Sequence, residues 1–151
     1  MLAGDFSAIT VDDDPIFLDL LEAILGEIGI KKVVRADSGV NAYQALAALK
    51  SRIDFIFCDL KMPNGNGLQL LREVRLGRFK LVRPDACFIM VTAITHPLAI
   101  KTAAQLDVSG YVTKPISTEQ LMDGIKKARA KAIKVDFGRY SSVTLPDTAA
   151  A

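Results

Sequence analysis

The sequence contains little cysteine and histidine, and this scarcity excludes several common kinds of site. Its two cysteines, Cys58 and Cys87, each lie inside an apolar run, where reduced cysteine behaves as a small hydrophobic side chain. We therefore expect neither a disulfide framework nor a zinc site. The single histidine, His96, stands beside Pro97 in a predicted loop, which favours an exposed side chain without an acid-base role. No serine or cysteine catalytic triad can be assembled without it.

Charge of one sign and long apolar segments are also scarce. The 19 basic and 17 acidic residues give a formal net charge of +2 and form no run of like charge. Nucleic acid and a membrane surface are therefore not expected partners. No apolar segment approaches the roughly 20 residues that span a bilayer, and residues 1–7 lack the basic start and apolar core of a secretory signal. The sequence predicts a cytoplasmic location.

The 151 residues contain alternating strand and helix patterns, at a length that suits one domain. The strand patterns are residues 8–11, 33–34, 53–58, 87–91 and 110–113. A helical pattern follows each of them, and strict alternation of this kind predicts an α/β fold with a parallel sheet and helices on both faces. In the first helix, the apolar positions with helical spacing are Ile16, Leu20, Leu21, Ile24, Leu25 and Ile28.

Three helix starts have recognisable capping residues. Asp14 precedes the first helix and Ser38 the second, and both side chains can accept a hydrogen bond from the first turn. Before the fifth helix, Ser117 and Gln120 have the spacing of a capping box. We expect Asp14 to act as a cap and not as part of a site.

The helical pattern ends near residue 133. Beyond it, apolar residues follow no period, and Gly138, Pro146 and a terminal alanine run intervene. We expect residues 1–132 to form the domain and residues 133–151 to form a flexible C-terminal tail or linker. The alternative is a segment that packs on the domain or leads to a further domain.

Polar residues stand at the carboxyl ends of four strand patterns. They are Asp12, Asp13, Asp59, Thr92 and Lys114. Because the carboxyl ends of parallel strands meet at one edge of a sheet, where ligands bind in such folds, we expect these side chains to converge. Three carboxylates at one edge repel each other unless a cation offsets the repulsion. Mg²⁺ prefers oxygen ligands of this kind and is the cation that we expect.

These residue types also suit phosphoryl chemistry. An aspartate can act as a nucleophile toward phosphorus and form an acyl phosphate, provided that cations neutralise the phosphoryl oxygens. Lys114 fits that neutralising role, and the hydroxyl of Thr92 can hydrogen-bond a phosphoryl oxygen once it is present.

Four short motifs resemble those of response-regulator receiver domains, over roughly residues 8–132. They are Val11-Asp12-Asp13-Asp14, Cys58-Asp59-Leu60-Lys61-Met62-Pro63, Val91-Thr92-Ala93 and Tyr111-Val112-Thr113-Lys114-Pro115. All occur in the order of that family and at the ends of alternate elements. The resemblance implies a flavodoxin-like, doubly wound (βα)5 sandwich of three layers, whose parallel five-stranded sheet has the order 2-1-3-4-5.

The resemblance also implies roles for the pocket residues. Asp59 would be the phosphoacceptor, and Asp59, Thr92 and Lys114 would perform the chemistry. Asp13 and Asp59 would ligate Mg²⁺ directly, Asp12 largely through water, and Lys61 through its backbone carbonyl. Thr92 and Tyr111 would form a switch pair, and Lys114 would precede a cis Pro115. Asn66 and Asp107 depart from the usual aspartate and glycine of the family, but both tolerate the turns expected there.

A receiver domain is a signalling module and not an enzyme, with activity limited to its own phosphorylation and dephosphorylation. The resemblance implies a sensor histidine kinase or a histidine phosphotransfer protein as phosphate donor, a downstream target protein, and a monomer or a weak dimer on phosphorylation. Two alternatives stay open. A haloacid-dehalogenase-like phosphatase would use Asp12 and Asp14 but lacks its usual residue at Ile16 and leaves Asp59 idle. A degenerate receiver would bind partners without phosphorylation.

Overall fold

A computed structural model describes residues 2–62 and 66–146 of the chain. Strands and helices alternate as the sequence predicts, and a further short helix lies near the end. The strands are β1 (Ser7–Val11), β2 (Lys32–Ala36), β3 (Phe55–Cys58), β4 (Cys87–Thr92) and β5 (Gly110–Thr113). The helices are α1 (Pro15–Ile28), α2 (Gly39–Ala47), α3 (Gly67–Arg75), α4 (Pro97–Gln105), α5 (Thr118–Ala130) and α6 (Phe137–Ser142).

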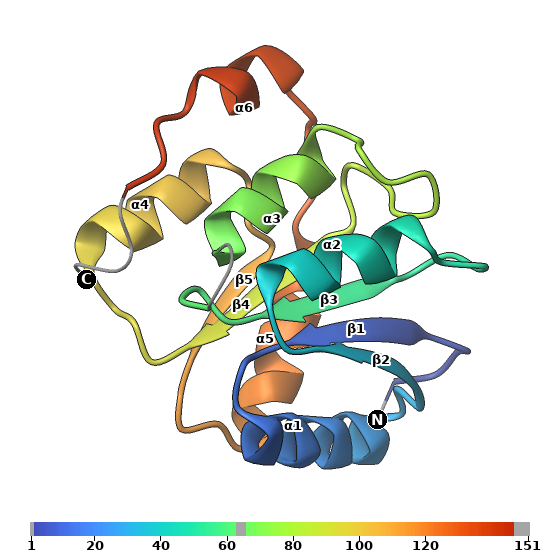
Figure 1. Cartoon of the computed structure of the whole chain (residues 1–151). Helices are drawn as coiled ribbons and strands as arrows, with labels where there is room; N and C mark the ends of the chain where they lie inside the picture. The colour runs from blue at the N-terminus through green and yellow to red at the C-terminus, as the bar shows by residue number, and fades with distance from the viewer. Residues whose placement is uncertain (1, 63–65, 147–151) are drawn as a thin grey trace.

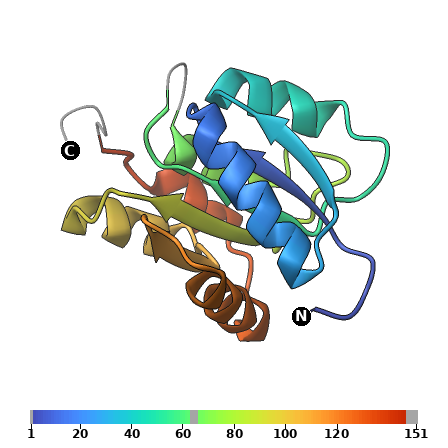
Figure 2. The same cartoon turned by 90° about the horizontal axis from the view of Figure 1, so that it is seen from below.

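The strands form one parallel sheet in the order β2-β1-β3-β4-β5, with helices on both faces (Figure 1). α1 and α5 cover one face, which Figure 2 turns toward the viewer, and α2, α3 and α4 cover the other. Successive residues of β3 serve the two faces in turn: Phe55 and Phe57 join the core under α1 and α5, and Ile56 and Cys58 join the opposite core. The predicted flavodoxin-like sandwich and its strand order are confirmed.

The predicted helix caps are in place. The side chain of Asp14 accepts a hydrogen bond from the Ile16 backbone N–H at 3.0 Å, and Ser38 caps α2 in the same way. Ser117 and Gln120 exchange two hydrogen bonds of 3.2 Å and form the expected capping box. These local patterns therefore fix where α1, α2 and α5 begin.

The predicted apolar face of α1 is only partly correct. Ile16 and Leu20 are exposed, with 78% and 47% of their surface accessible, and Leu18 is buried in their place. The remaining predicted positions are buried, namely Leu21, Ile24, Leu25 and Ile28. A helical period shows which residues share a face, but apolar residues occur on two faces of this helix, and the sheet decides which face is covered.

Residues 133–146 of the C-terminal segment pack on the domain, which is the second arrangement that the sequence allows. Its helix α6 lies against α3 (Figure 1), and Tyr140 is completely buried. Three partly buried side chains of the segment pack against the same core, namely Val135, Val143 and Leu145. The backbone carbonyl of Val143 also accepts a hydrogen bond from Arg72 in α3.

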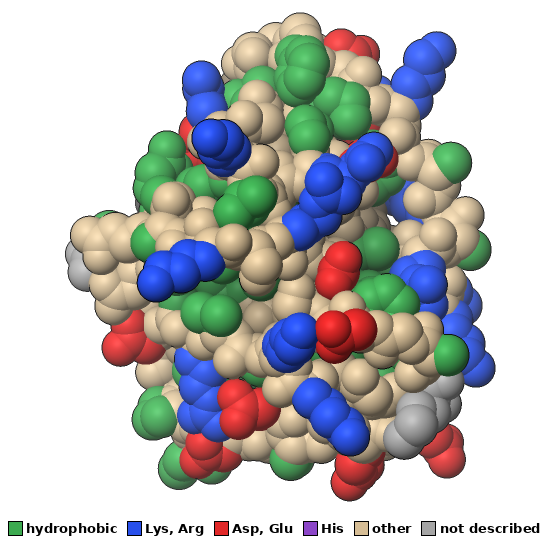
Figure 3. All heavy atoms as spheres, turned by 90° about the vertical axis from the view of Figure 1, so that its right-hand side faces the viewer, with side chains coloured by type: hydrophobic (Ala, Val, Ile, Leu, Met, Phe, Trp, Pro, Cys, Tyr) green, Lys and Arg blue, Asp and Glu red, His purple; other side chains and the backbone are tan. Residues whose placement is uncertain are grey.

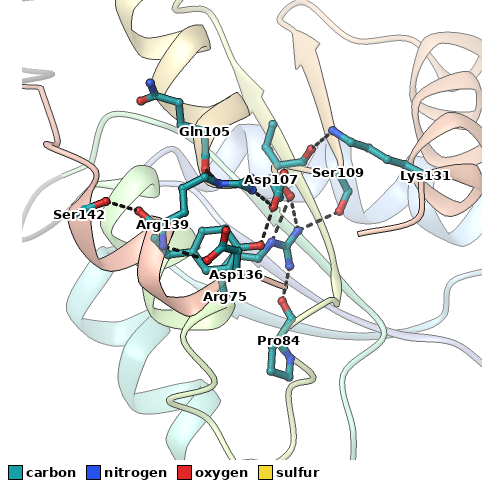
Figure 4. A network of polar contacts seen from close by, with 11 residues as sticks. Arg75, Pro84, Gln105, Asp107, Ser109, Lys131, Asp136, Arg139 and Ser142 are labelled. Carbon is teal, nitrogen blue, oxygen red and sulfur yellow. Dashed lines mark hydrogen bonds and ion pairs between the residues drawn. The ribbon is translucent and has the colours of Figure 1, made fainter. Parts of the chain in front are cut away.

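Asp107 links the C-terminal segment to the loop after α4 (Figure 4). Its backbone has a φ of 53°, in the left-handed region that aspartate tolerates, as the sequence analysis expects. Its side chain accepts hydrogen bonds from the Tyr140 hydroxyl and the Arg139 guanidinium group. Arg139 also donates to the Gln105 carbonyl at 3.2 Å. The segment is therefore held by polar contacts as well as by apolar packing.

We expect Tyr140→Phe to lower the free energy of unfolding by about 1 kcal/mol, because it removes the hydrogen bond to Asp107 and keeps the buried ring. Urea denaturation followed by circular dichroism measures this change. Tyr43→Phe is the matched control, because Tyr43 is 44% exposed and packs edge-on against Phe79 with its ring. An equal loss of stability in the two variants would contradict a specific role for the Tyr140 hydroxyl.

The surface seen in Figure 3 mixes charges of both signs. Lysine and arginine side chains alternate there with aspartate and glutamate, so this face presents no broad field of one sign to a phosphate backbone. Among the described residues, every helix is too short or too polar to cross a lipid bilayer.

Candidate functional site at the strand ends

The pairing of β1 with β3 brings the acidic residues together. Val11 and Cys58 are partners in the parallel ladder, so the residues that follow them, Asp12 and Asp59, leave the sheet side by side. The Asp59 N–H donates to the Val11 carbonyl at 2.9 Å, which extends the ladder by one residue. Likewise, the Lys114 N–H donates to the carbonyl of Thr92 at 2.9 Å across β4 and β5. The predicted convergence at one edge of the sheet is present.

Three carboxylates form a cluster at this edge. Asp12 is buried, Asp59 is half-buried and Asp13 is exposed, and one oxygen of each lies within 4.8 Å of the others. Backbone donors hold two of them, since Asp12 accepts from the Asp14 N–H at 2.9 Å and Asp59 from the Leu60 N–H at 2.7 Å. Burial raises the pKa of Asp12, although the hydrogen bond from Lys114 opposes this effect. The hard oxygen donors and their spacing fit a divalent cation such as Mg²⁺.

Lys114 joins this cluster from the end of β5. Its ammonium nitrogen lies 2.6 Å from Asp12 Oδ2 and 3.2 Å from Asp59 Oδ2. Burial lowers the pKa of Lys114, but the hydrogen bond with Asp12 and the charge of Asp59 outweigh burial and raise the pKa above its ordinary value. The side chain therefore supplies a positive charge directly beside the Asp59 carboxylate. The peptide bond that follows Lys114 is cis, as the resemblance implies.

Thr92 and Tyr111 both contact the backbone of Ile94. The buried Thr92 hydroxyl oxygen accepts from the Ile94 N–H at 3.2 Å, and the Tyr111 hydroxyl donates to the Ile94 carbonyl at 2.6 Å. The half-buried Tyr111 has a raised pKa, because of burial and the nearby charge of Asp59. The two residues of the expected switch pair are thus connected through one residue of the loop after β4.

An open hollow of about 550 Å³ lies beside the Asp59 carboxylate. It is lined by Asp13, Asp59, Lys61, Met62, Thr92, Ala93 and Ile94. It therefore borders Asp59 and three other predicted site residues, Asp13, Lys61 and Thr92. Pro63, the last residue of the second motif, and its neighbours Asn64 and Gly65 lie outside the described residues.

Two residues near the site were missed by the sequence analysis. A Cβ atom on Gly67 would lie 2.5 Å from the Asp59 carbonyl oxygen, so the start of α3 can approach this backbone only with glycine. The ring of Phe17 in α1 lies against Lys114, with 4.0 Å between its centroid and the ammonium nitrogen. The position of Gly67, between the loop after Asp59 and the start of α3, is a sequence signal for a close backbone contact. No pattern in the sequence singles out Phe17.

Comparison with known proteins gives a consistent result. A family model described as the response regulator receiver domain matches residues 8–126. The chain is 33% identical to the chemotaxis protein CheY of Pseudomonas aeruginosa over 119 residues, which are 79% of this chain and 92% of that protein. It is 30% identical to the transcriptional regulatory protein AruR of the same organism, over 78% of this chain and 47% of that protein.

A solved structure has the same fold. It is a CheY-like response regulator receiver domain from Methanospirillum hungatei JF-1, with a TM-score of 0.72 and 23% sequence identity, over 84% of this chain and 96% of that one. The haloacid-dehalogenase alternative is not favoured by these matches. It would also need Asp14 in the site, whereas the side chain of Asp14 caps α1.

Proposed function

This chain belongs to the family of response regulator receiver domains, which are signalling modules of two-component systems, and from this premise we propose that it accepts a phosphoryl group on Asp59. The observation that carries the proposal is the position of the Asp59 carboxylate. It lies 3.2 Å from the Lys114 ammonium group, borders an open hollow and has two further carboxylates beside it. Few loop aspartates have a cation, an approach route and acidic neighbours together.

In the proposed reaction, a carboxylate oxygen of Asp59 attacks the phosphorus atom of a phosphohistidine or acyl phosphate donor. The new O–P bond forms as the P–N or P–O bond of the donor breaks. The electron pair of that bond stays with the imidazole, which takes up a proton, or with the carboxylate that leaves. Lys114 neutralises negative charge on the phosphoryl oxygens, and the Thr92 hydroxyl donates to one of them after transfer.

Asp13 and Asp59 would ligate Mg²⁺ directly, Asp12 largely through water, and Lys61 through its backbone carbonyl. The fit of the three carboxylates to a small hard cation supports this assignment. When bound, the ion supplies positive charge that stabilises the phosphoryl oxygens during transfer.

Phosphorylation would be read out through Thr92 and Tyr111. When Thr92 turns to a phosphoryl oxygen, its bond to the Ile94 N–H is lost, and the loop that also holds the Tyr111 hydroxyl is free to rearrange. The altered surface would then bind a downstream target protein, with a sensor histidine kinase or a histidine phosphotransfer protein as donor. A monomer, or a weak dimer on phosphorylation, and a cytoplasmic location remain predictions.

The proposal is tested by incubating the chain with acetyl phosphate and measuring its intact mass. We expect one phosphate per chain, which hydroxylamine removes because acyl phosphates react with it. Removal of Mg²⁺ by a chelator is expected to slow incorporation by at least about a hundredfold, since the ion stabilises charge in the transition state. If neither acetyl phosphate nor phosphoramidate modifies the chain in the presence of Mg²⁺, the phosphorylation-independent alternative is favoured.

A further inference from the structure

The ammonium group of Lys114 has neighbours on three sides. Two are the carboxylates of Asp12 and Asp59, and the third is the ring of Phe17, which the ammonium nitrogen faces at 4.0 Å from the centroid. Phe17 comes from the first turn of α1, whereas Lys114 follows β5, so the contact joins two elements that meet only in the folded chain. The Lys114 side chain is left 20% exposed.

The ring occupies the boundary between core and site. Phe17 is half-buried and packs on the core under α1 and α5, while its preceding neighbour Ile16 is exposed. An aromatic ring adds a partial negative charge on its face, which attracts an ammonium group and does so more strongly where water is excluded.

We propose that Phe17 is a positioning residue for Lys114, whose ring holds the ammonium group beside Asp12 and Asp59 in readiness for the incoming phosphoryl oxygens. This inference rests on the proposed function and deepens it. A free lysine side chain has four flexible bonds and loses considerable entropy when it is fixed in one place. Contact with the ring reduces the number of positions that the ammonium group can adopt before phosphate arrives.

The chemical nature of the ring suits this role better than a third carboxylate would. During transfer, Lys114 must move part of its interaction from the carboxylates to the phosphoryl oxygens. The attraction of a ring face for a cation depends weakly on direction and persists through a small displacement, whereas a hydrogen bond of 2.6 Å is directional. The ring has no formal charge, so it competes with the phosphoryl group for the ammonium group less than a carboxylate would.

The test compares variants in their initial rate of phosphorylation by acetyl phosphate, a small donor that needs no docking surface. Phe17→Leu is expected to lower the rate about fivefold, and Phe17→Tyr, which keeps the ring, to stay within about twofold of the native chain. Phe6→Leu is the matched control and should leave the rate unchanged. Phe6 packs on the same core, with the Arg129 guanidinium group 4.9 Å from its ring, away from the site.

A second measurement does not depend on phosphorylation. Protons that lie over a ring face resonate upfield in NMR spectra, so the ε-methylene protons of Lys114 should be shifted upfield in the native chain and in Phe17→Tyr. The shift should disappear in Phe17→Leu. Ordinary Lys114 resonances in the native chain, or a native rate in Phe17→Leu, would overturn the inference. A native chain that shows the upfield shift but takes no phosphate would instead disprove the proposed function.

Discussion

Asp59→Asn is expected to abolish phosphate incorporation from acetyl phosphate. Asparagine has nearly the shape of aspartate, and its side-chain oxygen can still accept the hydrogen bond that the Leu60 N–H donates at 2.7 Å. The neutral amide is, however, a very poor nucleophile toward phosphorus, and the substitution also removes one negative charge from the acidic cluster. Intact mass measurement after incubation with Mg²⁺ should therefore find one phosphate on the native chain and none on this variant.

The matched control for this experiment is Asp54→Asn. Asp54 precedes the same strand, β3, at the opposite end, where its side chain accepts from the Ser7 N–H at 2.9 Å. Its replacement removes the same charge from the chain without reaching the acidic cluster, so phosphate incorporation should match that of the native chain. If Asp59→Asn took up phosphate at the native level, another residue would be the acceptor.

Arg75→Met is expected to lower the free energy of unfolding by about 3 to 5 kcal/mol. Arg75 is completely buried, and its guanidinium group donates to three backbone carbonyls and one hydroxyl. Figure 4 shows the acceptors on Pro84, Asp107 and Ser109 around it. The acceptors are the carbonyls of Pro84, Ala86 and Asp107 and the hydroxyl of Ser109, at 2.7 to 3.1 Å. Methionine fills much of the space but cannot donate, so these buried acceptors lose a partner.

Burial lowers the pKa of Arg75, as expected for a cation that is removed from water. Arg75→Lys keeps the charge but not the planar arrangement of donors, so it should recover part of the loss and not all of it. Arg78→Met is the control, because Arg78 is exposed and pairs with Glu73 at the surface, at 3.1 Å. The urea denaturation midpoint is measured for the three variants Arg75→Met, Arg75→Lys and Arg78→Met. A native midpoint in Arg75→Met would show that the hydrogen bonds of Arg75 contribute little to stability.

Much of the fold follows from local patterns. The run from Phe55 to Cys58 is apolar on both faces, as a central strand of a covered sheet must be, and Asp59 directly follows it. In α5 the structure buries Leu121, Ile125 and Ala128, whose spacing is that of a single helical face. These patterns succeed because the helix and strand periods are set by the chain itself and need no knowledge of its neighbours.

The hydrophobic pattern did not predict which residues are buried where a helix has apolar residues on two faces, or where a segment has no hydrophobic period. Ile16 and Leu20 fit a helical face as well as Leu18 does, and only the position of the sheet distinguishes them. Tyr140 lies in a segment without periodicity, yet it is buried against the core and bonded to Asp107. Single anchoring residues of this kind leave no repeated signal in the sequence.

The alternation of strands and helices follows from local sequence patterns. These patterns also place Asp12, Asp59, Thr92 and Lys114 at one edge, because parallel strands bring their carboxyl ends to the same edge of the sheet. Which further side chains contact that edge, and which hold the C-terminal segment, depends on the three-dimensional fold. The contacts of Phe17 with Lys114, and of Arg75 and Tyr140 with Asp107, each join residues distant in the chain. Their energies depend on distance and burial in three dimensions, which no local periodicity records.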